Sequence, residues 1–319
     1  MDALFKQLAF ELERFDAKDK EIETLFIGGG TPSTVPAKLY RPIFELLAPY
    51  LKNDAEITTE ANPNSATLSW IQEMKTLGVN RISFGVQSFN DEKLKFLNRA
   101  HNRDDAVRAV NDAAQAGLKN ISLDIIYATA LDTKELLQED LKQAFSLPIN
   151  HISAYALTIE EGTLFEKTPE VAFEKLSLTN FVFDTIKKNG FFQYEISNFG
   201  TYQSRHNLGY WQYKNYIGAG SGAVGSKDGV RYYPSTDIDF YISNPLHVRE
   251  ENLTEEEQKA EKLFLGLRSV VGVDEAILTE DELKRANLLV DEKKLTKADN
   301  RFYNKNYLLS DEISLFILN

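Results

Sequence analysis

Three consecutive glycines, Gly28 to Gly30, stand directly after a short apolar run and before Thr31. Glycine lets a ligand come close to the backbone, and a glycine turn leaves amide N–H groups free to donate hydrogen bonds to it. Ligands of parallel α/β folds sit at the carboxyl ends of the strands. The segment therefore fits a ligand-binding loop, and it fits a plain tight turn between a strand and a helix about as well.

Polar side chains recur in or just after the apolar runs that follow. Glu60 ends one run, Gln87 ends another, and Asp124 stands inside a third. Burying such groups costs free energy unless they have partners, so their repetition at one end of successive strands indicates a site for a polar ligand. Arg99 could bind a ligand carboxylate through its two-pronged guanidinium, although a surface arginine is the simpler interpretation.

The elements that must position these residues alternate between strand and helix patterns. Short apolar runs predict strands over 22–30, 55–62, 80–87, 120–127, 151–158 and 191–197. Amphipathic spacing predicts helices over 2–16, 36–51, 65–77, 104–116, 134–146 and 171–188. Strands separated by helices in this way indicate βα units and a parallel sheet. Six strands favour a partial or complete barrel over an open doubly wound sheet.

The alternation of strands and helices stops near Phe199. The following stretch is rich in glycine and tyrosine, and helical spacing returns at 255–267 before short helices and short polar strands end the chain. We therefore expect three domains. They are a partial barrel over 1–199, an extension packed on it over 200–253, and a small C-terminal domain over 254–319.

Composition excludes several classes of function. The formal net charge of −12 argues against general nucleic-acid binding, which needs a basic face. The sequence shows neither a long apolar run for a transmembrane helix nor the pattern of a secretory signal. Cysteine is absent, which rules out disulfides, thiolate metal sites and cysteine nucleophiles. We expect a cytoplasmic protein.

Together the segments are specific for one family. In order they are IGGGTPS, TEANP, RISFGVQSFND, LNRAH, LDIIY, HISAYALTIEEGTLF, YEISNFG and RHNLGYWQYKNYIGAGSGAVGS. They resemble the radical-SAM family that contains oxygen-independent coproporphyrinogen III oxidase, and within it the heme-chaperone (HemW-type) branch. The closing NYLLSDEISLFIL resembles the small C-terminal domain of that family. The resemblance implies an α/β fold with a partial parallel (β/α)6-type barrel that lacks its first strand, plus a small C-terminal helical domain.

The resemblance also implies a pocket for S-adenosylmethionine at the strand ends. The glycine turn would hold the amino-acid end, with an acid near the amino group, polar contacts to the ribose side, an arginine at the carboxylate and a threonine in the adenosine pocket. The residues in these positions are Gly28, Gly29, Gly30, Thr31, Glu60, Gln87, Asp124, Arg99 and Thr158.

His206, Asn207 and Tyr210 match the family's HNxxY pattern, which is linked there to heme. Histidine and tyrosine both ligate heme iron in proteins, whereas a lone histidine beside aromatic residues is more often a packing residue. The resemblance implies that heme binds here and is delivered to a heme-dependent protein, whose identity the sequence does not give.

The chain departs from the family at the iron–sulfur site. Members hold a 4Fe-4S cluster with three cysteines in a CxxxCxxC loop, and this chain has none. The resemblance places that loop ahead of the helix beginning at Asp2, so we expect a truncated member whose first visible strand has an unpaired edge. We expect no radical activity, no catalytic residues and weak or absent S-adenosylmethionine binding. The residues from Ala128 to Leu131 also replace the family's glycine- and proline-containing turn.

Four interpretations of function stay open. The chain is a truncated heme chaperone, a natural cluster-free heme carrier, a fragment of an oxygen-independent coproporphyrinogen III oxidase, or a barrel protein with an unrelated substrate. Whether it is an enzyme, dimerises or contacts a membrane surface stays open as well.

Overall fold

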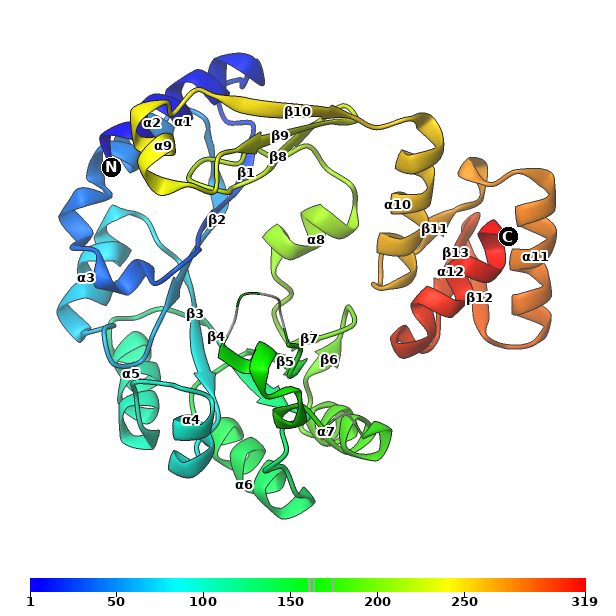
Figure 1. The fold of residues 1–319 in the computed structure, drawn as a ribbon, viewed down its shortest axis with the longest axis horizontal. Coiled ribbons are helices and arrows are strands. Elements are labelled where there is room, and N and C mark those ends of the chain that lie inside the picture. The colour runs from blue at the N-terminus through cyan, green and yellow to red at the C-terminus, as the bar shows by residue number, and fades with distance from the viewer. Residues whose placement is uncertain (160–161, 163, 174) are drawn as a thin grey trace. The chain divides into compact units, whose positions relative to one another are not determined.

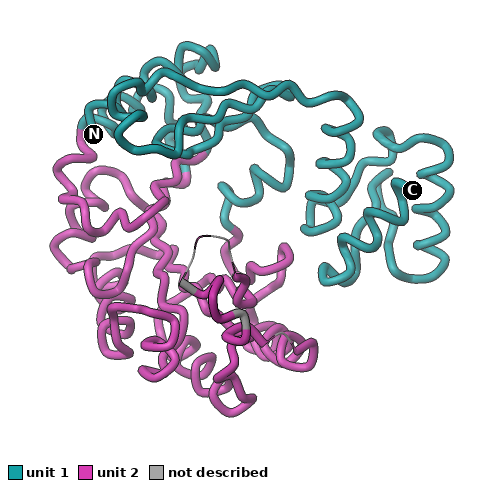
Figure 2. Tube along the Cα trace, in the orientation of Figure 1, with its two compact units in different colours: residues 1–23, 42–55, 204–319 teal, residues 24–41, 56–203 magenta. Residues whose placement is uncertain are grey.

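The computed structural model describes residues 1–159, 162, 164–173 and 175–319. Of the predicted segments, Glu160, Glu161 and Thr163 in the motif after the fifth strand lie outside the described residues, as does Glu174 in the helix expected over 171–188. The chain forms two compact units, drawn in separate colours in Figure 2. Unit 1 comprises residues 1–23, 42–55 and 204–319, and unit 2 comprises residues 24–41 and 56–203. The division into three domains stays a prediction.

A seven-stranded sheet has the order β1-β2-β3-β4-β5-β7-β6 (Figure 1). Its strands are β1 Ile22–Ile27, β2 Leu51–Ala61, β3 Arg81–Gln87, β4 Asn120–Tyr127, β5 His151–Ala156, β6 Phe192–Gln193 and β7 Asn198–Gly200. Neighbours from β2 to β5 run parallel, and in Figure 1 the strands of unit 2 curl into a half-barrel with helices on the outer side. The expected α/β class and parallel-dominated partial barrel are confirmed.

Helices follow the strands of unit 2, and all of them except the short helix over 91–96 fall in segments where the pattern predicts a helix. They are α3 Leu68–Leu77, α4 Asp91–Phe96, α5 Arg103–Gln115, α6 Lys134–Phe145 and α7 Leu176–Lys188, with 3-10 turns η1 Pro32–Thr34, η2 Ala37–Leu39, η3 Leu164–Lys167 and η4 Pro169–Val171. Polar side chains fix their starts, because Thr67, Asn102 and Thr133 each accept a hydrogen bond from a first-turn amide.

The two faces of the half-barrel differ in chemistry. On β4, Ile121, Leu123 and Ile125 are almost fully buried in the apolar core. Three of the alternating positions, Asn120, Ser122 and Asp124, are polar, and Ser122 on β4 pairs in register with His151 on β5. The inner face is therefore polar, whereas a closed barrel without a ligand fills its interior with packed apolar side chains.

Three predicted elements are wrong in detail. The single strand expected over 191–197 is replaced by β6 and β7, which are antiparallel to each other, and β7 is antiparallel to β5. A turn separates them, in which the amide of Ser197 donates to Oε1 of Glu195 at 3.1 Å. The helix over 36–51 is shortened to η2 and α2 Arg41–Leu47, since Pro49 does not continue a helix and β2 already begins at Leu51. The helix over 171–188 begins only at Leu176.

Unit 1 contains α1 Asp2–Arg14 and an antiparallel sheet of β8 Gly225–Lys227, β9 Val230–Pro234 and β10 Val248–Asn252. It also contains α8 Arg205–Trp211 and α9 Ile238–Ser243. Its C-terminal part holds α10 Glu255–Leu267, β11 Val273–Asp274, η5 Glu275–Ile277, α11 Glu280–Asp291, β12 Leu295–Ala298, β13 Arg301–Asn304, η6 Tyr307–Leu309 and α12 Ser310–Leu318. The helix predicted over 255–267 is confirmed as α10.

The C-terminal part of unit 1 has an apolar core of its own. Leu263, Leu267, Phe302 and Ile317 are among its almost fully buried members, drawn from α10, β13 and α12. None of the helices in the described part of the chain combines the length and apolar character needed to cross a bilayer.

Candidate functional site

The glycine turn after β1 lies against the carboxyl end of β2. The amide of Gly29 donates to Oε2 of Glu60 at 3.2 Å. Gly29 and Gly30 have φ angles of 76° and 62°, a region that glycine adopts readily. A Cβ on Gly28 would lie 2.5 Å from the ring of Phe26 and 2.9 Å from Oε2 of Glu60. The structure therefore brings the predicted turn and the predicted acid together, and only glycine fits at position 28.

Two carboxyl groups on the inner face of unit 2 have perturbed acidity. Burial, together with the nearby charge of Glu60, raises the pKa of Asp124 to about 6 against the opposing hydrogen bonds with Ser153 and Ser83. The hydroxyl of Ser83 lies 3.4 Å from Oδ1 of Asp124. Burial also raises the pKa of Glu60, against the opposing hydrogen bond from the amide of Gly29. Two neighbouring acids that resist ionisation suit a ligand that brings positive charge or hydrogen-bond donors.

Arg99 is the basic partner expected in this cluster. Burial lowers the pKa of its guanidinium, and attraction to Asp124 opposes that shift. Its Nε atom is buried and makes no hydrogen bond to any described residue. A buried donor without an acceptor is uncommon in folded proteins, so Arg99 has capacity left for a ligand.

Gln87 ends β3 with a φ angle of 68°, where a residue other than glycine is strained. The register between β3 and β4 shifts over Phe84 to Gln87, so the strained residue stands at an irregularity of the sheet. Thr158 is exposed, and its hydroxyl lies 3.5 Å from the carbonyl of Ala156. Within the described ranges no hydrogen bond joins Thr158 to the acidic cluster.

The sequence reasoning missed further polar residues of the inner face. Glu195, just before β7, is only 1% exposed, and burial raises its pKa to about 7. Tyr155 on β5 is 42% exposed as a whole residue, yet desolvation of its hydroxyl and the nearby charges of Asp124 and Glu195 raise its pKa. Asn198 hydrogen-bonds Glu195 through its side chain, yet its Oδ1 is buried without a partner among the described residues. The alternation of polar residues along β5 was the signal that could have revealed this extension.

A buried ionic cluster supports the loops that carry the site. Nζ of Lys93 on α4 lies 2.6 Å from Oδ1 of Asp132, and neither side chain is exposed. Asp140 on α6 accepts from the hydroxyl of Ser88 at 2.7 Å and from the amide of Phe89 at 2.6 Å. The loop after β3 is thus fixed directly beyond Gln87. No local pattern predicted this cluster, because lysines on short helices are normally exposed.

The predicted heme motif lies on α8 in unit 1. Nε2 of His206 and the hydroxyl oxygen of Tyr210 are 3.1 Å apart, and the two rings meet edge to face with centroids 4.9 Å apart. The amide of Asn207 donates to the Ser204 hydroxyl, which caps the helix. The histidine and the tyrosine of the motif therefore lie one helical turn apart with their side chains in contact, and the asparagine lies in the first turn of α8.

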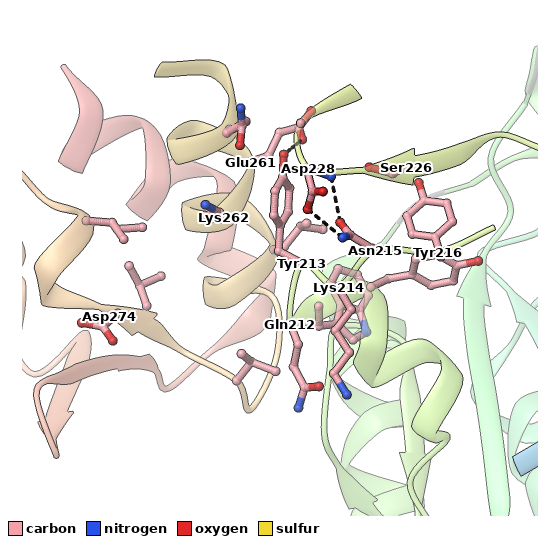
Figure 3. Close-up of a pocket in the computed structure, with 18 of the residues that line it drawn as sticks. Gln212, Tyr213, Lys214, Asn215, Tyr216, Ser226, Asp228, Glu261, Lys262 and Asp274 are labelled. Atoms are coloured by element: carbon pink, nitrogen blue, oxygen red, sulfur yellow. Dashed lines mark hydrogen bonds between the residues drawn. The ribbon is translucent and has the colours of Figure 1, made fainter. Parts of the chain in front are cut away.

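A cavity of about 550 Å³ adjoins this motif within unit 1. Figure 3 shows its residues coming from the segment after α8, from β8 and β9, and from α10 and β11. Tyr210 contributes to the lining and His206 is not part of it. The volume falls in the range usual for small-molecule sites. No sequence pattern predicted this cavity, because its lining is assembled from distant segments.

Comparisons with known proteins agree with this architecture. A family model described as the radical SAM superfamily matches residues 5–144. The heme chaperone HemW of Lactococcus lactis is 33% identical over 287 residues, which cover 86% of this chain and 75% of that protein. The HemW protein of Bacillus subtilis is 32% identical, and the match covers 73% of that protein. That of Escherichia coli is 40% identical over 217 residues, 66% of this chain and 57% of that protein.

Among solved structures, coproporphyrinogen III oxidase (HemN) from Escherichia coli, a radical SAM enzyme, superposes with a TM-score of 0.80. The superposition covers 99% of this chain and 82% of that chain, at 18% identity. At that identity the likeness shows a common fold and carries nothing about the reaction.

Proposed function

The chain belongs to the HemW family of radical SAM proteins, and from that premise we propose that it binds heme and delivers it to a heme-dependent protein. The observation that carries the proposal is the hydrogen-bonded pair of His206 and Tyr210 on α8. Both side chains are of types that ligate heme iron, and Tyr210 lines a cavity of suitable size. Relatives named heme chaperones resemble this chain more closely in sequence than the oxidase does.

The residues present do not fit an iron–sulfur cluster. Clusters of the radical SAM type are held by thiolates, and none of the 319 residues is cysteine. No reaction step through a cluster follows from this chain.

The inner face of unit 2 does fit S-adenosylmethionine. Its ammonium group would face Glu60, and its ribose would lie beside Asp124. Its carboxylate would pair with Arg99, whose Nε lacks a partner among the described residues. The turn from Gly28 to Thr31 supplies backbone donors and close access. When bound, the sulfonium supplies an activated methyl or adenosyl carbon. The chain's own side chains orient the molecule and balance its charge.

Gln87 and Thr158 complete the proposed pocket on the ribose and adenosine sides. The strained backbone of Gln87 is the feature that supports its assignment. The assignment of Thr158 to the adenosine side rests on its position after β5.

A heme titration tests the proposed function. Wild-type protein and the His206→Ala variant are titrated with hemin while the Soret band is followed. Saturable binding that weakens in the variant is the expected result. Absence of saturable binding in the wild type would refute heme carriage by this chain. Equal binding by both proteins would refute the assignment of the site to α8.

A further inference from the structure

Helix α8 ends in a turn whose left-handed position is occupied by Tyr213. The amide of Tyr213 donates to the carbonyl of Tyr210 at 2.9 Å, and the amide of Lys214 donates to the carbonyl of Gly209 at 3.0 Å. This pair of hydrogen bonds is the Schellman arrangement, in which the left-handed residue is usually glycine. Tyr213 has a φ angle of 59° and is the only aromatic residue with a positive φ in the part of the chain that the structure describes. A bulky side chain is strained in this conformation, so the turn costs free energy that glycine would avoid.

The side chain of Tyr213 is held by α10. Its hydroxyl donates to Oε2 of Glu261 at 2.8 Å, and Figure 3 shows Tyr213 pointing toward Glu261. Oε1 of Glu261 pairs with Arg231 on β9. Nζ of Lys262, also on α10, lies 5.1 Å from the centre of the Tyr213 ring. Strained residues persist where their surroundings over-determine them, and here the carboxylate and the ammonium group of α10 do so.

A glycine turn elsewhere in the chain shows what the tyrosine adds. After α5, the amide of Gly117 donates to the carbonyl of Ala114 at 2.9 Å, and the amide of Leu118 donates to the carbonyl of Ala113 at 3.1 Å. The φ angle of Gly117 is 83°, so the backbone arrangement is the same and closes the helix without strain. The turn itself therefore does not require a tyrosine, and the contact with α10 accounts for the residue type at position 213.

Helix α8 depends on the contacts at its two ends. It has seven residues, and none of their side chains is buried. A short helix with little packing of its own is marginally stable, so the groups that fix its ends decide its position. Its start is capped by the hydroxyl of Ser204, and its end is held through Tyr213. Helix α10, in contrast, contributes Leu263 and Leu267 to the apolar core of the C-terminal part of unit 1, so a firmly packed helix holds a weakly packed one.

We infer that Glu261 is a positioning residue that fixes the end of α8 through Tyr213. It thereby sets the orientation of the His206–Tyr210 pair, which the same helix carries. The inference rests on the proposed function, because this pair is the motif that the function uses. The connection is short, since the carbonyl of Tyr210 accepts the amide of Tyr213. The C-terminal part of unit 1 thus acts on the motif without contributing a residue to it.

Amide hydrogen exchange over α8, read by mass spectrometry on the whole chain, tests this anchor. Tyr213→Phe and Glu261→Ala should each speed the exchange by about threefold or more, the factor expected from one lost hydrogen bond. The double variant should exchange no faster than Glu261→Ala, because both changes remove the same hydrogen bond. Glu261→Gln keeps an oxygen acceptor for Tyr213 and should restore part of the protection. Glu256→Ala, which removes an exposed carboxylate from α10, is the matched control. Exchange over α8 that stays at the wild-type rate, or that rises equally over α8 and α11, would overturn the positioning role.

The NMR signals of the His206 ring and the affinity for hemin test the effect on the motif. The chain has 4 histidines, so a His206→Gln variant assigns these signals. They should shift in Tyr213→Phe and Glu261→Ala but not in Glu256→Ala, and hemin binding should weaken by about threefold to tenfold in the first two variants only. Signals that do not respond, or hemin affinity unchanged in both variants, would overturn the positioning role. If the signals respond but the wild type binds no hemin, the proposed heme carriage fails and the anchor stands.

Discussion

The amide of Gly29 donates to Oε2 of Glu60 at 3.2 Å, and the same carboxylate oxygen occupies the space that a Cβ on Gly28 would need. Because the Gly28 Cβ would come within 2.9 Å of that oxygen, Gly28→Ala should displace Glu60 from the turn. We expect binding of S-adenosylmethionine, measured by equilibrium dialysis, to weaken by about tenfold or more, with a stability loss of about 1–3 kcal/mol from overpacking.

Gly209→Ala provides the control for this experiment. A Cβ on Gly209 would make only one ordinary contact, with Lys214 at 3.9 Å, and Gly209 lies in unit 1. Equal S-adenosylmethionine binding by the two variants would contradict the pocket assigned to the glycine turn.

Asp124 should make stability depend on pH. Burial raises its pKa from 3.8 to about 6, so the folded state takes up a proton that the unfolded state releases. The stabilising contribution of the protonated acid is complete below pH about 4 and is lost as the pH rises through about 6. Asp124→Asn should therefore match the wild type in acid and exceed its free energy of unfolding above neutrality by about 1–3 kcal/mol.

Urea unfolding of Asp124→Asn and of the wild type, in acid and above neutrality, tests whether the variant is the more stable protein only at the higher pH. Asp184→Asn, which alters an exposed carboxylate on α7, should show the same difference from the wild type at each pH. A wild type more stable than Asp124→Asn above neutrality would show that this carboxylate is not destabilised by burial.

Lys93→Met should destabilise unit 2 strongly. The side chains of Lys93 and Asp132 are fully buried, so removing the ammonium group leaves a buried carboxylate uncompensated. The expected loss is about 3–5 kcal/mol in denaturant unfolding, and adding Asp132→Asn should recover part of it. Lys95→Met, an exposed site on the same helix, should stay within about 0.5 kcal/mol of the wild type. Comparable losses at both lysines would contradict the buried cluster.

Gly266 and Gly209 are both helical glycines, and they should respond oppositely to alanine. At Gly266 a Cβ would lie 2.4 Å from the carbonyl oxygen of Gly272, so Gly266→Ala should cost about 1–3 kcal/mol despite better helix propensity. At Gly209 there is room, so Gly209→Ala should be neutral or gain up to about 1 kcal/mol. Thermal unfolding of both variants measures the difference, and a stabilised Gly266→Ala would show that α10 is not in close contact with the segment before β11.

The parallel strands and their helices were predictable because each has a local signature. β4 begins and ends at the predicted residues, since its apolar run is bounded by glycine-containing and helix-starting segments. The segment over 191–197 was misjudged because its hydrogen bonding is decided by Glu195, whose turn is set by tertiary burial. The six-residue helix α4 is too short to show a period.

The candidate site could be predicted where residues of ligand-binding types stand at the ends of strands. Glu60 and the glycine turn meet as expected, and Arg99 lies near Asp124. Glu195 and Lys93 could not be found, because nothing in their local sequence shows that the fold buries them. Burial of a charged side chain is a property of the assembled sheet and helices, and periodicity reports only which face an element presents.

The complete burial of Lys93 makes its amine a chemical reporter. An acylating reagent reacts with accessible lysines at once, but it reaches Lys93 only when α4 separates from the loop carrying Asp132. The rate at which this lysine is modified, read by mass spectrometry, therefore measures the opening of unit 2. Comparing that rate with the labelling of Lys259, only partly exposed in unit 1, would show whether the two units unfold together or in succession.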